Sequence, residues 1–270
     1  MGQQLHNLSE QSLIQAIEAN TSEFLLALGR VGGGEERDEA TVQWTIGGAP
    51  ISYHNCVVRA HLTTETADEV IATSMRRFQA YNVPGSWHVG PSMRPLDLNT
   101  RLLRYGFTDG GEEPGMAVDL LTLHEQNSPL AGFVIERVSN EQELQVWTRT
   151  LAAGFGEGEI EANWVGEMYR KIGFDRQGAW HHYLGYLNGE PVATTSLFLG
   201  AGVAGIYFVF TLPQARGRGI GTAITRAALL DARSWGYQIG VLAASSMGYS
   251  IYRSLGFREY CRFHLYEWEP

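Results

Sequence analysis

One stretch constrains the fold of this chain more than any other: residues 206–221, IYFVFTLPQARGRGIG, which run directly into TAITRAALLDARSWG. Apolar, β-branched and aromatic residues at positions 206–210 are typical of a buried strand, and Pro213 ends it. Apolar residues then recur at helical spacing, at Ile220, Ile224, Ala227 and Leu230. The stretch therefore predicts a strand, a tight glycine-rich loop and a helix that begins near Gly219.

The loop between the strand and the helix has the composition of an anion site. Its glycines let the backbone turn sharply and approach a ligand closely, and the helix start offers free N–H groups and a positive dipole end. A Walker loop is excluded because Ile220-Gly221-Thr222 lacks the lysine that reaches terminal phosphates. A dinucleotide fingerprint is disfavoured because the next strand ends Leu242-Ala243-Ala244-Ser245, without an acidic residue for a ribose.

What remains is the pattern Arg-x-x-Gly-x-Gly, and it resembles the acyl-CoA pyrophosphate loop of the GNAT acetyltransferases. A second stretch supports the resemblance: residues 246–257, SMGYSIYRSLGF, are similar to the closing helix of that family, with its Tyr-x-x-x-Gly-Phe ending. The resemblance implies a GNAT fold, an α/β fold of the mixed α+β kind in which a central mixed sheet is flanked by helices. It also implies acetyl-CoA as co-substrate and no metal.

The resemblance assigns roles to particular residues. In the family, backbone groups of the central strand bind the pantetheine arm and the thioester oxygen, and the matching positions here are Val209, Phe210 and Thr211. The pyrophosphate is expected on the loop and first helical turn, at Arg216, Gly217, Arg218, Gly219, Ile220, Gly221 and Thr222. Ser245 stands where the family often has an asparagine that holds the pantetheine, and Tyr249 is a further expected cofactor contact.

Direct acetyl transfer needs a neutral amine and a proton for the leaving thiolate. Tyr252 matches the family tyrosine that supplies this proton, and its phenol has a usual pKa close to that of an alkyl thiol. The base is less constrained: candidates are Glu157, Glu159 and Glu161 in the loop between two helices, and His181 and His182 at the start of a hairpin strand. We take Glu161 as the predicted base.

Composition narrows the class of protein. The chain has 270 residues, of which 44% are hydrophobic and 18% charged, so it can bury a sizeable core. A net charge of −9 without a basic cluster beyond Arg216 and Arg218 argues against nucleic-acid partners. Cys56 and Cys261 are the only cysteines, with no CxxC spacing, and are expected to be buried small hydrophobes. With no secretory signal and no membrane span expected, a cytoplasmic protein is predicted, and a homodimer stays open.

Two domains are expected, residues 1–125 and 126–270, with a linker near residues 122–132. The order helix, Gly-Phe, strand occurs at residues 102–107 and 116–120 and again at residues 252–257 and 264–268. The first half has no Arg-x-x-Gly-x-Gly loop, and residues 83–87, VPGSW, are taken as the corresponding place. The sequence therefore predicts a tandem in which a degenerate GNAT-like half without a CoA loop precedes a complete one.

Periodicity places the remaining elements. In the first half, a helix capped by Ser9 precedes a flexible charged loop at residues 32–38, strands at 41–46, 56–62, 87–89 and 116–121, and helices at 64–81 and 98–105. In the second half, strands are expected at 133–138, 180–187 and 191–199, a helix after the Asn140 cap, and another around 164–172. Asn188-Gly189 is the preferred pair for a tight hairpin turn.

The leading hypothesis is an acetyl-CoA-dependent N-acetyltransferase that acts on a primary amine of a small molecule or peptide by direct attack. The alternative is a non-catalytic acyl-CoA-binding sensor or interaction module that keeps the loop without turnover. The presence of Tyr252, which matches the family's proton donor, favours the enzyme over the sensor. A dinucleotide oxidoreductase is a third hypothesis, disfavoured by the missing acidic ribose partner. Acceptor pockets are built from variable loops, so the sequence does not identify the amine.

Overall fold

The computed structural model describes residues 4–125 and 130–270. Its helices are α1 (Glu10–Gly32), α2 (Ala67–Tyr81), α3 (Leu98–Arg104), α4 (Glu141–Ala152), α5 (Glu159–Ile172), α6 (Ile220–Ser234) and α7 (Tyr249–Ser254), with 3-10 turns η1 (Ser52–His54), η2 (Leu120–Thr122) and η3 (Pro213–Ala215). Its strands are β1 (Glu35–Asp38), β2 (Val42–Ile46), β3 (Cys56–Ala60), β4 (Gly85–Val89), β5 (Thr108–Asp119), β6 (Phe133–Arg137), β7 (Trp180–Leu187), β8 (Glu190–Gly200), β9 (Val203–Thr211), β10 (Ile239–Ala243) and β11 (Arg258–Trp268).

The chain divides into two compact units that interleave in sequence. The larger unit contains the described residues up to Asn20 and those of Met116–Tyr260, and the smaller unit contains Thr21–Gly115 and Cys261–Pro270. The predicted domains, 1–125 and 126–270, describe two repeats rather than compact units, and they stay a prediction. Part of the predicted linker, residues 126–129, lies outside the described residues.

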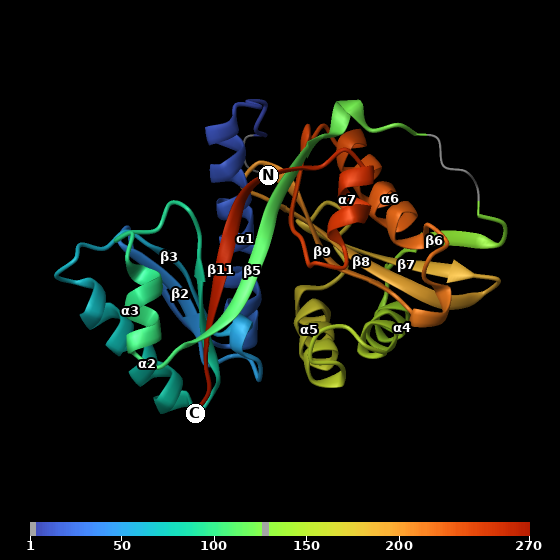
Figure 1. The fold of residues 1–270 in the computed structure, drawn as a ribbon. Helices are drawn as coiled ribbons and strands as arrows, with labels where there is room; N and C mark the ends of the chain where they lie inside the picture. Colours follow the sequence, from blue (N-terminus) through green and yellow to red (C-terminus); the bar gives the residue numbers. More distant parts are fainter. Residues whose placement is uncertain (1–3, 126–129) are drawn as a thin grey trace. The chain divides into compact units, whose positions relative to one another are not determined.

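The larger unit is a mixed sheet covered on both faces. Its strand order is β5-β10-β9-β8-β7-β6, with β6 to β9 antiparallel and β10 parallel to β9. Helices α4 and α5 lie on one face of this sheet and α6 and α7 on the other (Figure 1). The helix predicted after Gly219 is confirmed, and Ile220 and Ile224 are buried in the core as predicted. The buried face then continues through Ala228 and Leu229 instead of the predicted Ala227 and Leu230, which are only partly buried. This layered α/β arrangement is the predicted GNAT fold.

Local signals in the larger unit work as the sequence predicts. The Asn140 side chain accepts a hydrogen bond from the Glu143 amide at 2.9 Å, and the Glu143 carboxylate accepts one from the Ser139 amide at 2.7 Å. This reciprocal pair fixes the start of α4. Asn188 and Gly189 both have positive φ, at 53° and 86°, as the tight turn between β7 and β8 requires.

The smaller unit repeats part of this plan. Its strand order is β1-β2-β3-β4-β11, and β3 and β4 are parallel and joined through α2, as β9 and β10 are joined through α6. The core packs Trp44, Ile71 and Trp87 between sheet and helices. Both cysteines, Cys56 in this core region and Cys261 on β11, are free and buried, as predicted. No described helix is long and apolar enough to cross a membrane.

Three expectations need correction. The charged segment Glu35–Asp38 is an edge strand that pairs antiparallel with β2, although it was predicted as a loop; only the partner strand supplies the missing signal. Strand β5 begins at Thr108 instead of Met116. Glu159 and Glu161 lie in the first turn of α5 and not in the preceding loop, because Gly158 ends the loop earlier than apolar spacing suggested.

A fourth correction concerns the counterpart of the glycine loop. Residues 83–87, the predicted place, lead instead from α2 into β4. The segment that leads from β3 into α2, as the glycine loop leads from β9 into α6, is residues 61–66, HLTTET. The sequence comparison matched a Gly-containing segment by composition, whereas the order of strands and helices identifies the true equivalent.

Candidate functional site

The glycine-rich loop joins the end of β9 to the start of α6 with an open backbone. Gly217 and Gly219 have φ of 73° and 77°, a conformation that favours glycine. A Cβ atom built on either residue would meet no atom within 4 Å, so the space beside both is open. Gly219 is the N-cap of α6 and has no side chain to cap the helix. The first N–H groups of this 15-residue helix therefore point towards open space beside the loop.

The two arginines of the loop have different surroundings. Arg216 donates from Nε to the carbonyl of Thr211 at 2.9 Å, and its guanidinium lies 5.7 Å from the centre of the Phe210 ring. Arg216 thus holds the end of β9 through one of the five N–H groups of its guanidinium. Arg218, between the two glycines, is exposed. An anion at the start of α6 would find Arg218 beside it without the loss of an internal contact.

The strands above the loop diverge. Strands β9 and β10 pair over two rungs, Ala204 with Gly240 and Gly205 with Val241. Strand β9 continues to Thr211, and within the described residues no further rung joins it to β10. This part of β9, which includes Val209, Phe210 and Thr211, therefore has an edge that a bound chain of pantetheine size can follow.

A bulge lies in this same part of β9. Across the ladder, Thr194 faces Phe210 and Ser196 faces Tyr207, so Phe208 and Val209 together oppose Thr195 alone. Phe208 has a φ of 49°, which is rare for a residue with a bulky side chain. This bulge has no signature in the sequence, since a run of apolar residues is the same with or without it.

Helix α7, which carries Tyr252, packs against the start of α6. A Cβ built on Gly221 would lie 3.5 Å from Ile251 of α7 and 3.6 Å from the Thr211 hydroxyl, so α6, α7 and the end of β9 meet there. Tyr252 is 8% exposed, and burial raises the pKa of its phenol to about 12. The phenol therefore holds its proton throughout the neutral range, as a proton donor must, but it is a weaker acid than free tyrosine.

The other two residues expected near the cofactor are already engaged locally. The Ser245 hydroxyl accepts a hydrogen bond from the Gly248 amide at 3.2 Å in the turn before α7. The Tyr249 hydroxyl donates to the Glu259 carboxylate at 3.0 Å. Both lie on the segment that faces the start of α6, and their roles as cofactor contacts stay predictions.

Glu161 has a buried carboxyl with a pKa near neutrality, as suits a general base. Its side chain is fully buried, and Oε2 accepts a hydrogen bond from the Glu157 amide at 3.1 Å while Oε1 has no partner. Burial raises the pKa of this carboxyl to about 7, and the hydrogen bond from Glu157 opposes the rise. Glu157 and Glu159 are exposed, so Glu161 differs from both.

Aromatic contacts place the loop before Glu161 on the bulge. The Phe155 ring packs against Phe208 with 5.4 Å between ring centres and against Phe210 with 6.4 Å. A Cβ on Gly154 would lie 3.7 Å from the Phe210 ring. The segment from α4 to α5 therefore covers the bulge on the face opposite α6. Sequence reasoning missed Phe155; its only signal is an aromatic residue between glycines.

The two candidate histidines are packed into the sheet. His182 stacks on Tyr169 at 3.7 Å and its Nδ1 shares a hydrogen bond with the Ser196 hydroxyl at 2.9 Å. Burial lowers the pKa of His182 to about 3, and burial together with the Arg137 charge lowers that of His181 to about 4. Both rings are neutral at pH 7, and their contacts are those of structural side chains.

The smaller unit lacks an equivalent opening. Before the start of α2, the Thr63 and Thr66 side chains accept hydrogen bonds from each other's backbone amides, at 3.3 and 3.1 Å, and so hold this segment in a local turn. The strand edge is occupied as well: the Arg94 amide donates to Ala60 at 2.9 Å, and the Leu62 amide donates to Arg94 at 3.1 Å. The chain itself thus fills the place between β3 and β4, which supports the prediction that this half does not bind CoA.

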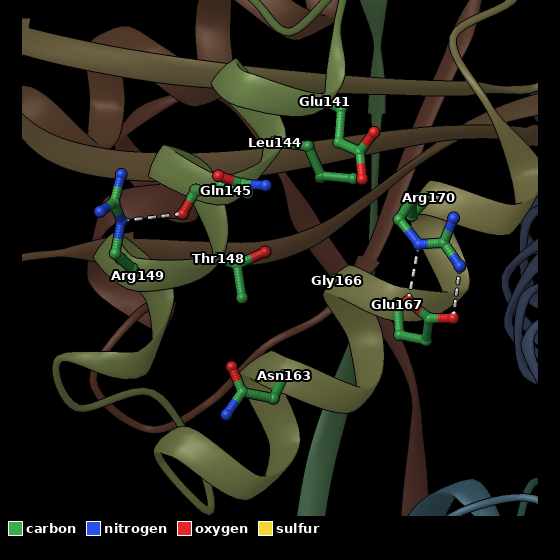
Figure 2. A pocket seen from close by; sticks show the side chains of 9 residues that line it. All are labelled: Glu141, Leu144, Gln145, Thr148, Arg149, Asn163, Gly166, Glu167 and Arg170. Carbon is green, nitrogen blue, oxygen red and sulfur yellow. Dashed lines mark hydrogen bonds and ion pairs between the residues drawn. The ribbon is translucent and has the colours of Figure 1, made fainter.

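A separate hollow of about 360 Å³ lies between α4 and α5. Figure 2 shows its charged lining, in which Glu167 and Arg170 form an ion pair of 2.8 Å and Glu141 and Arg149 belong to α4. None of the predicted site residues lines it. The site that the loop, the bulge and α7 form is therefore distinct from this hollow.

Comparison with known proteins agrees with this geometry. The model of the family described as acetyltransferase (GNAT) domain matches residues 178–259, which run from the start of β7 past α7. The chain contains a GNAT domain. The match includes the glycine loop, the bulge and Tyr252, but it does not reach Glu161 on α5. This match supports acyl transfer as the general activity.

Solved structures extend the likeness of fold to both units. A GCN5-related N-acetyltransferase from Kribbella flavida has a TM-score of 0.70 at 18% identity, over 91% of this chain and 94% of that chain. A conserved protein of unknown function from Staphylococcus epidermidis has a TM-score of 0.67 at 15% identity, over 87% and 94%. A tandem GNAT protein from the clavulanic acid biosynthesis pathway has a TM-score of 0.61 at 14% identity, over 84% and 78%. No curated protein matches the chain in sequence.

Proposed function

We propose that the chain is an acetyl-CoA-dependent N-acetyltransferase that acetylates a primary amine of a small molecule or peptide by direct attack. The observation that supports the proposal is the combination, within the segment that matches the GNAT domain, of an open helix N-terminus, a strand edge that diverges from β10 and a buried tyrosine on α7. A pyrophosphate suits the first, an extended pantetheine arm the second, and a leaving thiolate the third.

The residues divide the binding task along the length of the co-substrate. Gly217 and Gly219 leave room for the diphosphate against the amides of residues 217–222, and Arg218 adds charge. The edge of β9 beyond Gly205 offers backbone groups to the pantetheine. The amide of Val209, in the bulge, is the group assigned to the thioester oxygen, where negative charge develops during attack.

Proton transfers complete the reaction. When its own carboxyl is ionised, Glu161 accepts a proton from the ammonium form of the substrate, directly or through water, and so yields the neutral amine that attacks. The amine nitrogen forms a bond to the thioester carbon, the carbon–sulfur bond breaks, and Tyr252 donates its proton to the sulfur. The pKa of about 7 for Glu161 and the raised pKa of Tyr252 put each group in the required state near neutral pH.

The test uses the full chain with acetyl-CoA and a panel of primary amines, including peptides, and measures free thiol and the mass of the acetylated amine. Reactions without amine correct for hydrolysis. We expect amine-dependent thiol release with at least one member of the panel. Calorimetry with CoA distinguishes the enzyme from the alternative. Tight binding without turnover on any amine would indicate an acyl-CoA sensor. Absence of binding at millimolar CoA would refute both the enzyme and the sensor.

A further inference from the structure

Two kinds of contact hold the bulge in β9. Hydroxyl groups of β8 bind its backbone carbonyls, and aromatic rings pack on the Phe208 side chain. The Thr194 hydroxyl on β8 donates to the carbonyl of Phe208 at 3.0 Å, and the neighbouring Thr195 hydroxyl donates to the carbonyl of Tyr207 at 3.4 Å. Both threonines are fully buried. These bonds replace ladder contacts that the extra residue of the bulge disrupts.

The bond from Thr194 also sets the direction of an amide. The carbonyl of Phe208 and the N–H of Val209 belong to one planar trans peptide unit, in which they point in opposite directions. Since Thr194 on β8 holds the carbonyl, the Val209 N–H is directed away from Thr194, towards the side of β9 where β10 diverges. The hydroxyl therefore fixes an amide that it does not touch.

The Phe208 side chain secures the same peptide unit. A left-handed φ costs a residue of this kind about 1 kcal/mol or more, so the conformation needs support from its surroundings. Three rings surround that of Phe208: Trp147 of α4 at 6.0 Å, Tyr169 of α5 at 6.2 Å, and Phe155 at 5.4 Å. All three meet it edge to face, a favourable aromatic geometry.

We propose that Thr194 and Phe208 are positioning residues that aim the Val209 amide at the thioester oxygen. The inference rests on the proposed acetyl transfer and adds two side chains that do not touch the co-substrate. It also gives the α4–α5 segment a second role, because Phe155 of that segment packs on the residue that sets the amide. Loss of the Thr194 hydroxyl allows the peptide unit to rotate while the glycine loop stays intact.

The test compares Thr194→Val, which removes the hydroxyl at nearly constant shape, with Thr194→Ser, which keeps it. Thr150→Val is the matched control, because the Thr150 hydroxyl is also buried and donates to a carbonyl, that of Val146 at 2.9 Å, inside α4. We expect Thr194→Val to lower kcat about tenfold, as loss of one oriented hydrogen bond allows. We expect Thr194→Ser and Thr150→Val to stay close to the unchanged protein.

Affinities for acetyl-CoA and CoA distinguish a role of Thr194 in orienting the Val209 amide from a role in stabilising the fold. Thr194→Val should weaken acetyl-CoA several-fold and leave CoA, which lacks the carbonyl, unaffected. Equal weakening of both, or an unchanged kcat in a protein that binds CoA and turns over, would overturn the inference and leave the proposed function standing. If the unchanged protein binds no CoA, the proposed function fails first and this inference with it. Should Thr194→Val not fold, Thr194→Ala, which also lacks the hydroxyl, takes its place.

Discussion

Glu161 offers the sharpest test of the site, because one physical cause predicts both stability and activity. Burial raises the pKa of its carboxyl from 4.5 to about 7, so the folded protein keeps this proton over a range where the unfolded chain has lost it. The folded state binds more protons than the unfolded state between these two values. The contribution of Glu161 to the free energy of unfolding must therefore fall as pH rises through this window, and it is lowest above pH 7.

The size of the effect follows from the same two values. A tenfold change in the acid equilibrium corresponds to ~1.4 kcal/mol, so burial of the carboxylate at Glu161 costs the folded state about 3 kcal/mol above pH 7. Glu161→Gln carries no charge at any pH and escapes this cost. Relative to the unchanged protein, the variant should gain up to about 3 kcal/mol of stability between pH 4.5 and pH 8.

The assay is urea unfolding of both proteins at several pH values, with the difference in unfolding free energy plotted against pH. Glu157→Gln is the matched control, because it changes an exposed side chain of the adjacent loop and should leave the slope in place. A difference between Glu161→Gln and the unchanged protein that does not vary with pH would refute the reasoning that burial holds the proton on Glu161.

Activity should move in the opposite direction. The kcat/KM of the unchanged protein should rise with pH through about 7 as Glu161 ionises. In Glu161→Gln this limb should disappear and the rate should fall about 100-fold, the usual contribution of a general base. If Glu161→Gln is more stable at pH 8 and yet far less active, the lost activity comes from the missing carboxylate and not from unfolding. Full activity in Glu161→Gln would exclude it as the base.

Three further substitutions test the rest of the site. Gly219→Ala should cost about 1 kcal/mol of stability because its φ is 77°, and it should also weaken CoA; Gly106→Ala, with a φ of 88° and equally open space, should show the same cost of about 1 kcal/mol with CoA binding unchanged. Arg218→Ala should weaken CoA several-fold and flatten the dependence of binding on salt, which titration at two ionic strengths measures. Tyr252→Phe should slow acetyl transfer with little change in acetyl-CoA affinity; unchanged turnover would remove Tyr252 as the acid.

The parts of the site that the sequence predicted are those that local chemistry controls. Gly217 and Gly219 adopt a left-handed backbone conformation that few other residues tolerate. The glycines of the loop therefore predict the turn. The spacing of Ile220 and Ile224 sets the buried face of α6, and Asn140 starts α4, because helix periodicity and capping act within a few residues. These signals also gave the order of elements in the GNAT domain.

Tertiary structure alone decided the features that give those elements their chemistry. The bulge at Phe208 exists because Thr194 and Ser196 lock β9 in a shifted register and three rings from distant segments hold the strained residue. Glu161 is buried whereas Glu157 is exposed, and the contacts that bury Glu161, rather than its residue type, raise its pKa. Burial, register and strand divergence each depend on contacts between residues far apart in the chain. Such contacts do not produce a periodic pattern in the local sequence.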